Sequence, residues 1–409
     1  MNWDNYFAER ASRMTRSAVR ELLKLTAQPG MISFAGGLPS PDLFPTERVK
    51  EAIEIVLSKA GKRALQYGET EGVAELRDWI ARDFSRPEAP LKRENVVITS
   101  GGQQALDLIG RILLNENDQV IVENPTYLAL LSAWRLLGAQ FLPVPSDANG
   151  MCVDEIEPLL QQKPKLIYAV PNFQNPQGTT LGLERRVSLV ELLRKYDVGL
   201  LEDNPYGELR YEGEPVASLF ELDARIGASG DLDSNVIYVG TFSKVLMPGL
   251  RVGWAIASEQ VIEKIVRAKQ AADLQTGTLS QHIISEMIRD QFLERHIRVL
   301  RQAYRERRDA MLAALDRYFP NEASWTRPDG GMFLMVTLPA HLSASDVLKQ
   351  ALERKVAFVP GEEFHLNGMG RNTFRLNFSN APSDLIEQGI QRLGDVLKRI
   401  ITSAKASGE

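Results

Sequence analysis

The chain has 409 residues, of which 44% are hydrophobic and 25% are charged, and this composition is typical of an ordinary globular protein. A chain of this length predicts two or three domains, or one large α/β unit with a smaller companion. Its net charge is −5 and its basic residues are spread along the chain, which argues against a protein that binds nucleic acid.

The cysteine content and the first residues bear on where the protein works. The single cysteine, Cys152, has no partner for an intramolecular disulfide, as expected in a reducing cytoplasm. The N-terminus lacks a basic flank and an apolar signal core, and no apolar run approaches the roughly 18 residues of a membrane helix. The four histidines are scattered, so a structural metal site is not expected. We therefore expect a cytoplasmic protein whose partners include neither nucleic acid nor a membrane.

The first predicted elements are a helix and then a long α/β alternation. Residues 15–25 predict a helix with Val19, Leu22 and Leu23 on one face, ended by Pro29-Gly30. Between residues 95 and 260, apolar runs predict strands at 96–99, 119–122, 166–170, 198–201 and 236–240. Helical patterns between them predict helices at 103–114, 127–137 and 183–195. Strands this apolar, separated by helices, predict an α/β fold whose sheet is covered on both faces.

The pattern changes towards the C-terminus. Residues 259–320 predict two or more long helices. From Pro328 onward, strands are expected at 332–336 and 374–378, and helices at 344–354 and 383–400. We therefore expect an N-terminal segment over 1–45, a large domain over 46–310 and a small C-terminal domain over 311–409.

Several predicted strands end in polar residues, and in open α/β sheets ligands bind beyond the carboxyl ends of the strands. The strand at 96–99 runs into Ser100-Gly101-Gly102-Gln103, which opens a helix. Free amides and the helix dipole at such a turn bind anions, and glycine lets a phosphate approach closely. The same turn is also a common helix cap, so this motif alone leaves both interpretations open.

Three more strand ends carry groups suited to carbonyl and amine chemistry. Asn175 lies in an Asn-Pro turn after the strand at 166–170. Asp203 ends a buried strand, where an acid is costly unless a partner such as a protonated pyridine nitrogen pairs with it. Lys244 follows the strand at 236–240, where burial and cationic neighbours would lower its pKa and allow a Schiff base. Taken singly, each of these residues is also compatible with an ordinary turn, cap or solvated cation.

Together these motifs resemble a known family. The stretch from Thr241-Phe242-Ser243-Lys244 to Gly249-Leu250-Arg251-Val252-Gly253 resembles the pyridoxal-phosphate attachment signature of class I and II aminotransferases, of fold type I. Asn175-Pro176-Gln177-Gly178 and Asp203-Asn204-Pro205-Tyr206 resemble the family's other cofactor motifs in the same order. Arg375, in Phe374-Arg375-Leu376-Asn377-Phe378, is similar to its α-carboxylate-binding arginine. The resemblance covers essentially the whole chain.

The resemblance implies both a fold and a set of roles. The fold is a large domain with a mainly parallel, seven-stranded sheet covered by helices, plus a smaller α+β domain. As catalytic residues, Lys244 forms a Schiff base with pyridoxal phosphate and moves a proton, Asp203 pairs with the pyridine nitrogen, and Tyr206 contacts the ring oxygen. The remaining implied contacts are Tyr127 and Asn175 on the ring, Gly102, Gln103, Ser243 and Arg251 on the phosphate, and Arg375, Asn175 and Gly37 on the substrate.

Residues near the N-terminus look like the branch that contains 2-aminoadipate aminotransferase and kynurenine aminotransferase II. These are Ser33-Phe34-Ala35-Gly36-Gly37-Leu38-Pro39 and the helix from Arg20 to Leu25. In this branch a mobile N-terminal helix covers the substrate and its arginine meets the distal carboxylate, so Arg20 is a candidate for specificity; a solvated helix arginine is the alternative. The resemblance implies that Tyr67 reaches the phosphate of a neighbouring subunit in a homodimer.

Two positions depart from the pattern of the branch. Gly102 stands where a hydroxyl residue is common, so its phosphate contact is expected from the backbone alone. Thr241 stands where serine is common, and it keeps the hydroxyl.

The expected reaction is ping-pong transfer of an amino group from an L-amino acid to 2-oxoglutarate, with 2-aminoadipate, aromatic and branched-chain donors as candidates. A pyridoxal-phosphate lyase and a non-catalytic ligand sensor on the same fold are the alternatives. Related regulators carry an N-terminal DNA-binding domain, for which this chain has no room before its first motif. A nicotinamide dehydrogenase is less favoured, because no Gly-x-Gly-x-x-Gly follows an early strand.

Overall fold

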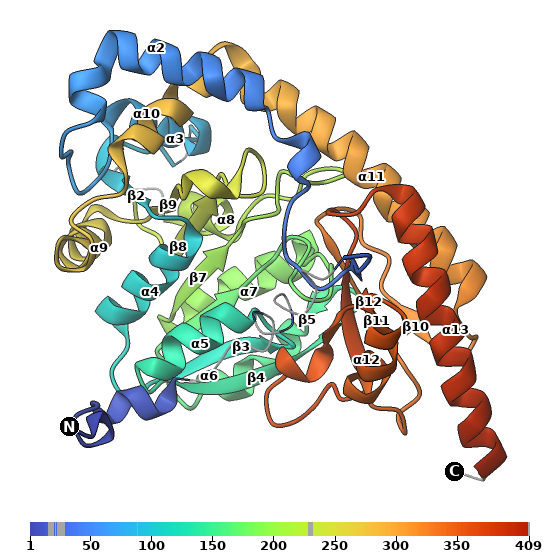
Figure 1. Ribbon diagram of the computed structural model, residues 1–409. Coiled ribbons are helices and arrows are strands. Elements are labelled where there is room, and N and C mark those ends of the chain that lie inside the picture. The colour runs from blue at the N-terminus through green and yellow to red at the C-terminus, as the bar shows by residue number, and fades with distance from the viewer. Residues whose placement is uncertain (15–19, 21, 23–28, 88, 228–231, 408–409) are drawn as a thin grey trace.

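A central sheet organises the computed structural model, which describes residues 1–14, 20, 22, 29–87, 89–227 and 232–407. Within these residues the sheet has eight strands in the order β2-β9-β8-β7-β6-β3-β4-β5 (Figure 1). Their bounds are β2 Val96–Thr99, β3 Gln119–Asn124, β4 Gln140–Asp147, β5 Gly150–Met151, β6 Leu166–Ala169, β7 Gly199–Asp203, β8 Val236–Thr241 and β9 Gly253–Ile256. The sheet has one strand more than expected because the two residues of β5 form a hairpin with the end of β4.

The strands of this sheet are mainly parallel. Strands β4, β3, β6, β7 and β8 pair in parallel, whereas β9 is antiparallel to both β8 and β2. The carboxyl ends of β2, β6, β7 and β8 therefore lie at one edge of the sheet. At that edge Gly253 of β9 pairs with Thr99 and Thr241. A Cβ atom at Gly253 would come within 2.8 Å of the amide nitrogen of Gly102, so this close approach requires glycine.

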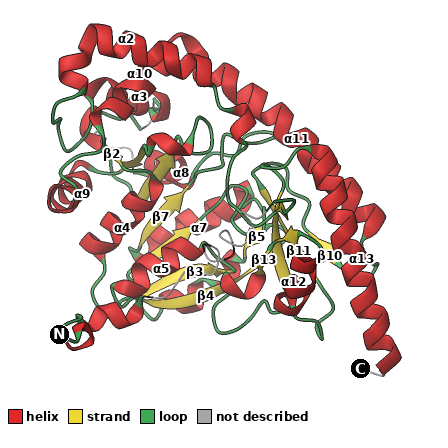
Figure 2. Cartoon of the chain, in the orientation of Figure 1, coloured by secondary structure: helices red, strands yellow, loops and turns green. Residues whose placement is uncertain are grey.

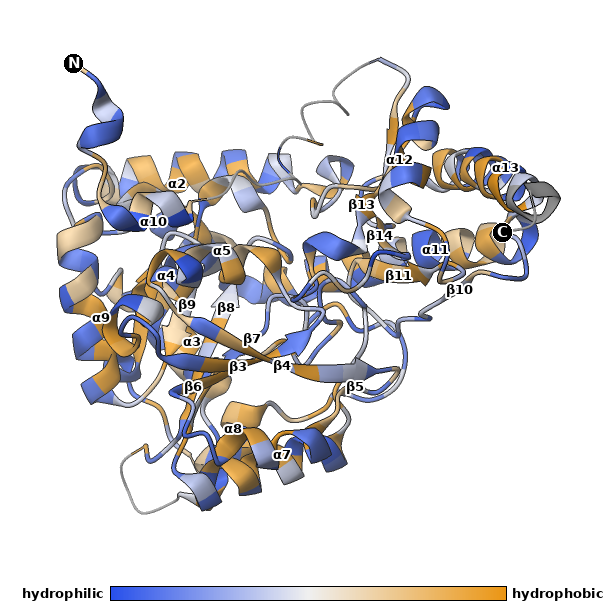
Figure 3. Ribbon diagram, turned by 90° about the horizontal axis from the view of Figure 1, so that it is seen from below, coloured by the Kyte–Doolittle hydropathy of each residue, from blue (hydrophilic) through white to orange (hydrophobic). Residues whose placement is uncertain are grey.

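Helices cover both faces of the sheet, as the apolar strands require. Helices α4 (Gly102–Leu113) and α5 (Leu128–Leu136) lie on one face, and α7 (Leu183–Tyr196) and α8 (Leu219–Ile226) lie on the other (Figure 3). Figure 2 shows the strands enclosed between these layers. The other helices of this part are α2 Thr46–Ala64, α3 Ala74–Phe84, α6 Glu157–Leu160, α9 Glu259–Ala272 and α10 Thr278–Met287. The α/β fold with a mainly parallel sheet is thus confirmed.

A second, smaller sheet and core form the C-terminal part. The antiparallel sheet has the order β10-β11-β14-β13. Its strands are β10 Ser324–Trp325, β11 Phe333–Thr337, β13 Val359–Pro360 and β14 Thr373–Asn377, and α12 Ala344–Glu353 and α13 Ser383–Ser407 accompany them. Strand β1 (Ile32–Ser33) pairs with β12 (Val356–Ala357). The segment before the large domain is therefore attached to the small one.

The long helix α11 (Phe292–Tyr318) joins the two parts, and it runs from beside α2 to α13 (Figure 1). Its residues Leu293 and Ile297 pack in the large hydrophobic core, whereas Met311 and Leu315 pack in the small one. We propose that the boundary between the two domains lies near residue 310 inside this helix. The continuity of the helix fixes how the two cores face each other.

The predicted elements agree with the structure where the periodicity is strong. The expected helix at 103–114 is α4, and the expected strand at 236–240 is β8. The expected helix at 15–25 lies mostly outside the described residues. Strand β4 was not predicted because Pro143 and Pro145 argue against a strand interior. In the described parts of the chain, no helix has the combined length and apolarity of a membrane span.

Candidate active site

Lys244 lies directly after β8, at the edge where the strands end. Its Nζ atom donates a hydrogen bond of 2.8 Å to the carbonyl oxygen of Gly37. The pKa of Lys244 is lowered from 10.5 to about 8, mainly by burial and also by the guanidinium groups of Arg375 and Arg251, while Asp203 acts in the opposite direction. An amine with this pKa is neutral in a useful fraction of molecules near neutral pH, so it can act as a nucleophile and a base.

Asp203 is the last residue of β7, and it is 6% exposed. The hydroxyl of Tyr168, on the neighbouring strand β6, donates a hydrogen bond of 2.8 Å to its Oδ2 atom. The pKa of Asp203 is raised to about 6, because the effect of burial outweighs the lowering by the hydrogen bond from Tyr168 and by the charge of Lys244. A buried carboxylate with a hydroxyl partner on one oxygen is suited to receive a cationic ring nitrogen.

Asn175, Tyr206 and Tyr127 supply neutral polar groups to the same site. The Nδ2 atom of Asn175 donates to the hydroxyl of Tyr206 at 3.5 Å, a long hydrogen bond. Burial raises the pKa of Tyr206, and it raises the pKa of Tyr127 to about 12 with a further contribution from Asp203. Both phenols are therefore protonated at neutral pH and can donate to an oxyanion.

Arg375 projects from β14 of the small domain and is 3% exposed. Its Nη1 donates to Oδ1 of Asn175 and its Nη2 donates to the carbonyl of Ala35, both at 2.7 Å. The guanidinium carbon lies 4.3 Å and 4.9 Å from the ring centres of Phe333 and Phe364. Its Nε has no hydrogen-bond partner within the described residues. A fixed, buried guanidinium of this kind is suited to bind a carboxylate.

The turn before α4 brings backbone amides close to the guanidinium of Arg251. Gly101 has φ of +80°, and a Cβ atom there would lie 2.7 Å from Nη2 of Arg251. The same Nη2 donates to the carbonyl of Ser100 at 3.2 Å. The first amides of α4, from Gly102 onward, have no acceptor within the helix. We refer to Ser100, Gly101, Gly102 and the Arg251 guanidinium as the cup, whose amides and positive charge suit a phosphate.

Two predicted phosphate ligands adjoin the cup in different ways. Ser243 is 8% exposed, and its Oγ accepts a hydrogen bond of 2.9 Å from the hydroxyl of Thr241. The side chain of Gln103 is exposed and donates to the carbonyl of Ala129 at 3.2 Å. Because that side chain is bonded to α5, Gln103 offers the cup its backbone amide.

Tyr67 and Arg20 are the two predicted site residues for which exposure is the main structural observation. Tyr67 is 78% exposed in the loop after α2. The amide of the next residue, Gly68, donates to Oε1 of Gln275. Arg20 is exposed, and its neighbours 15–19, 21 and 23–28 lie outside the described residues. The contacts of Tyr67 with a second subunit and of Arg20 with substrate therefore stay predictions.

Residues 30–393 match the family model of class I and II aminotransferases. The chain belongs to this family. The aminotransferase is 44% identical to 2-aminoadipate transaminase of Thermus thermophilus over 98% of this chain and 98% of that one. It is 43% identical to aromatic-amino-acid aminotransferase 1 of Thermococcus litoralis over 97% of this chain and 95% of that one.

The fold of the aminotransferase also matches a solved structure. The α-aminoadipate aminotransferase LysN of Thermus thermophilus, complexed with N-(5'-phosphopyridoxyl)-L-leucine, superposes with a TM-score of 0.91 at 42% identity. The match covers 98% of this chain and 100% of that chain. The predicted membership in fold type I is thereby confirmed.

The cofactor of this aminotransferase is pyridoxal phosphate, and its substrates are amino acids and 2-oxo acids. The residues at the sheet edge fit that cofactor. Lys244 offers an amine of lowered pKa to the aldehyde, and Asp203 offers a buried carboxylate to the ring nitrogen. The cup offers free amides and a guanidinium to the phosphate.

Sequence reasoning missed three groups that support the site of the aminotransferase. Tyr168 was assigned only to an apolar strand, although a tyrosine on the strand beside an acidic strand end is a signal for a hydrogen bond. Phe333 and Phe364 enclose Arg375 from positions that no motif marks. Lys269 is fully buried behind the cup, but in the sequence it stands in a charged helix and carries no distinguishing signal.

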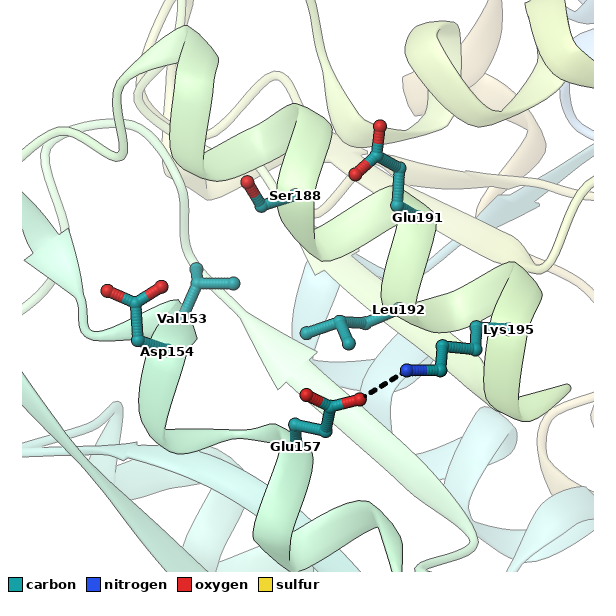
Figure 4. Close-up of a pocket in the computed structure, with 7 residues that line it drawn as sticks. All are labelled: Val153, Asp154, Glu157, Ser188, Glu191, Leu192 and Lys195. Atoms are coloured by element: carbon teal, nitrogen blue, oxygen red, sulfur yellow. Dashed lines mark hydrogen bonds and ion pairs between the residues drawn. The ribbon is translucent and has the colours of Figure 1, made fainter.

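The aminotransferase also has a surface pocket of about 350 Å³ that shares no residue with this site. It lies between α7 and the segment that leads into α6 (Figure 4). Its lining residues are Val153, Asp154, Glu157, Ser188, Glu191, Leu192 and Lys195. Glu157 accepts hydrogen bonds from Lys195 and Tyr196, so its charge is matched within the protein.

Proposed function

We propose that this aminotransferase transfers the amino group of an L-amino acid to 2-oxoglutarate by a ping-pong mechanism. The observation that carries the proposal is that two cationic side chains donate hydrogen bonds to the same backbone segment, residues 35–37. Lys244 donates to the carbonyl of Gly37, and Arg375 donates to the carbonyl of Ala35. This segment fixes the reacting amine relative to the carboxylate-binding guanidinium. An α-amino acid presents one amine and one carboxylate, so it is complementary to this pair.

The proposed cofactor contacts follow the geometry of the site. Asp203 pairs with the ring nitrogen, Asn175 and Tyr206 donate to the ring oxygen, and Tyr127 stacks on the ring. The phosphate receives the amides of Gly102 and Gln103 and the side chains of Ser243 and Arg251. When bound, pyridoxal phosphate acts as an electron sink that makes the Cα proton of an amino acid acidic.

Lys244 is the proposed proton carrier. Its lowered pKa of about 8 leaves roughly a tenth of the amine neutral at pH 7, against less than a thousandth for an ordinary lysine. With the cofactor bound, the neutral amine would accept the Cα proton of the donor and, as an ammonium, would give it back. In the first half-reaction the donor leaves its amino group on the enzyme and departs as a 2-oxo acid. In the second, 2-oxoglutarate takes up that amino group and departs as glutamate.

In the proposed recognition of substrate, Arg375 and Arg20 bind different carboxylates. Arg375 binds the α-carboxylate together with Asn175, and Gly37 lies beside it, where a Cβ atom would be 3.5 Å from the Phe333 ring. Arg20 binds a distal carboxylate when the donor has one. The relatives are named for 2-aminoadipate and aromatic donors, and the solved structure holds a phosphopyridoxyl derivative of leucine. We therefore propose 2-aminoadipate, aromatic and branched-chain amino acids as donors.

The proposed assembly is a homodimer. Tyr67 is a large side chain that is 78% exposed on one chain, and Leu65 beside it is 69% exposed. A second copy that covers this loop would bury both and bring Tyr67 to the neighbouring phosphate.

The direct test is a product analysis with 2-aminoadipate, phenylalanine or leucine and 2-oxoglutarate. The proposal predicts that glutamate and the matching 2-oxo acid form in equal amounts, and that no ammonia is released. Release of ammonia without glutamate would indicate the lyase instead. Tight ligand binding with no product from any donor would indicate the sensor.

A further inference from the structure

Lys269 is a fully buried lysine that the proposed reaction does not use. It lies in α9, which runs beside α4 (Figure 1), and its side chain is 0% exposed. Its Nζ donates to Oδ1 and Oδ2 of Asp273, at 2.8 Å and 2.9 Å, and to Oε1 of Gln104 at 2.9 Å. The three donors of the ammonium are thus matched by two side chains.

Gln104 connects this ion pair to the cup. Its Oε1 also accepts a hydrogen bond of 2.7 Å from the amide of Ser100, and its Nε2 donates to Oδ2 of Asp273 at 2.7 Å. Gln104 therefore makes hydrogen bonds to Lys269, to Asp273 and to the first residue of the cup.

Ser100 is held by each of its polar groups. Its amide donates to Gln104, its Oγ donates to Oδ2 of Asp273 at 3.2 Å, and its carbonyl accepts from Arg251. The turn that follows is Gly101, with φ of +80°, where the backbone has wide conformational freedom. A glycine turn needs an external restraint if the amides after it are to stay in one arrangement.

A buried ion pair is a weak source of stability because desolvation offsets its attraction. Burial lowers the pKa of Lys269, and the hydrogen bonds that Lys269 donates to Asp273 oppose this effect. The hydrogen bonds of Lys269 and Asp273 lead to the turn at Ser100. Their main effect is therefore to fix the geometry of that turn.

We infer that Lys269 and Asp273 position the cup for the phosphate of the cofactor. Acting through Gln104, the pair fixes Ser100 and thereby orients the first amides of α4 and the guanidinium of Arg251 towards one point. Lys269 is a positioning residue, since it acts through Gln104 and Ser100. The inference rests on the proposed use of the cup for the cofactor phosphate.

The test compares two aldehydes that differ by the phosphate. The cofactor is removed, and the apoenzyme is titrated with pyridoxal phosphate and, separately, with pyridoxal, which has no phosphate. Binding to Lys244 is followed by absorbance. The variants are Lys269→Met, which removes the charge and leaves an unbranched apolar side chain one atom shorter, and Lys264→Met, a control at an exposed position of the same helix. Thermal unfolding of each apoenzyme measures stability.

We expect Lys269→Met to weaken binding of pyridoxal phosphate at least about tenfold, the loss that follows when a charged hydrogen bond is removed. Binding of pyridoxal should change less than about twofold, because the Lys244 end of the site is untouched. Lys264→Met should leave both affinities unchanged. A parallel loss for both aldehydes, or no loss for either, would overturn the inference.

A second variant covers the possibility that Lys269→Met does not fold. Gln104→Met keeps the ion pair and the hydrogen bond from Ser100 Oγ to Asp273, but it removes the hydrogen bonds that join Gln104 to Lys269, to Asp273 and to the Ser100 amide. We expect the same selective loss for pyridoxal phosphate. Equal affinity for both aldehydes in the unaltered enzyme would instead refute the proposed phosphate role of the cup. An unaltered preference for pyridoxal phosphate in Gln104→Met would refute the positioning role alone.

Discussion

Arg375 and Asn175 are joined by a buried hydrogen bond of 2.7 Å between the guanidinium Nη1 and the amide Oδ1. The first residue lies on β14 of the small domain, and the second follows β6 of the large sheet. The proposed carboxylate-binding group is therefore oriented by a residue that also bonds to Tyr206. The proposed substrate recognition and the proposed cofactor contacts thus share one amide.

Arg375→Lys tests whether the Arg375 guanidinium binds the substrate carboxylate. Lysine keeps the charge but cannot donate to Asn175, Ala35 and a carboxylate in the planar geometry of arginine. We expect the KM for both the amino donor and 2-oxoglutarate to rise about 10–100-fold. Steady-state kinetics with each substrate varied in turn make the measurement. The control is Arg371→Lys, at an exposed position before β14, and it should behave as the parent enzyme. If KM is unchanged in Arg375→Lys as well, Arg375 does not bind the substrate carboxylate.

Tyr168→Phe tests the support of Asp203. Burial raises the pKa of Asp203 and the hydrogen bond from Tyr168 lowers it, with a net value of about 6. Its loss should raise that pKa further, so the carboxylate becomes protonated at a higher pH. The acid limb of the kcat profile should then move to higher pH, and kcat at pH 7 should fall about tenfold.

The control for this variant is Tyr196→Phe, which removes a tyrosine–carboxylate hydrogen bond of the same length, 2.8 Å, to Glu157. That bond lies at the pocket of Figure 4, apart from the site. Its loss should leave the pH profile in place. If Tyr168→Phe lowers kcat equally at every pH, its effect is structural and the account of Asp203 is wrong.

Complementation between two inactive variants tests the shared site. If Tyr67 serves the neighbouring subunit of a homodimer, as we propose, Lys244→Ala and Tyr67→Ala damage the same active site when they are on different chains. A mixed dimer then has one fully intact site and one doubly damaged site. Random reassociation should restore about a quarter of the parent activity. If Tyr67 serves its own chain, every site in the mixture keeps one lesion and no activity returns.

Arg20→Ala tests donor specificity. Removing a cation that meets a distal carboxylate should lower kcat/KM for 2-aminoadipate about tenfold or more while leaving leucine within about twofold. The ratio of the two values is the quantity to measure. An equal loss for both donors would show that Arg20 supports the fold or the helix and does not recognise the side chain.

The sequence predicts the reacting groups better than their supports. Lys244, Asp203 and Asn175 stand at strand ends, where strand periodicity alone predicts a common edge. Arg375 is far from these residues in the sequence, and it reaches them through the packing of the small domain. Strand periodicity does not predict that packing. Lys269 is indistinguishable from solvated lysines in the sequence, because its burial depends on the packing of α9 against α4. Strand β4 was missed because its prolines argue against a strand in the sequence, although the strand pairs with β3 in the structure.

The most direct test of the account is the absorbance spectrum of the purified holoenzyme before and after addition of 2-aminoadipate, glutamate, leucine or kynurenine, each alone. The account predicts a visible band from the cofactor bound to Lys244, which bleaches with true donors and returns when 2-oxoglutarate is added. The same treatment of Lys244→Ala should show neither the initial band nor the cycle. A band in the parent enzyme that no amino acid bleaches would contradict the proposed amino transfer.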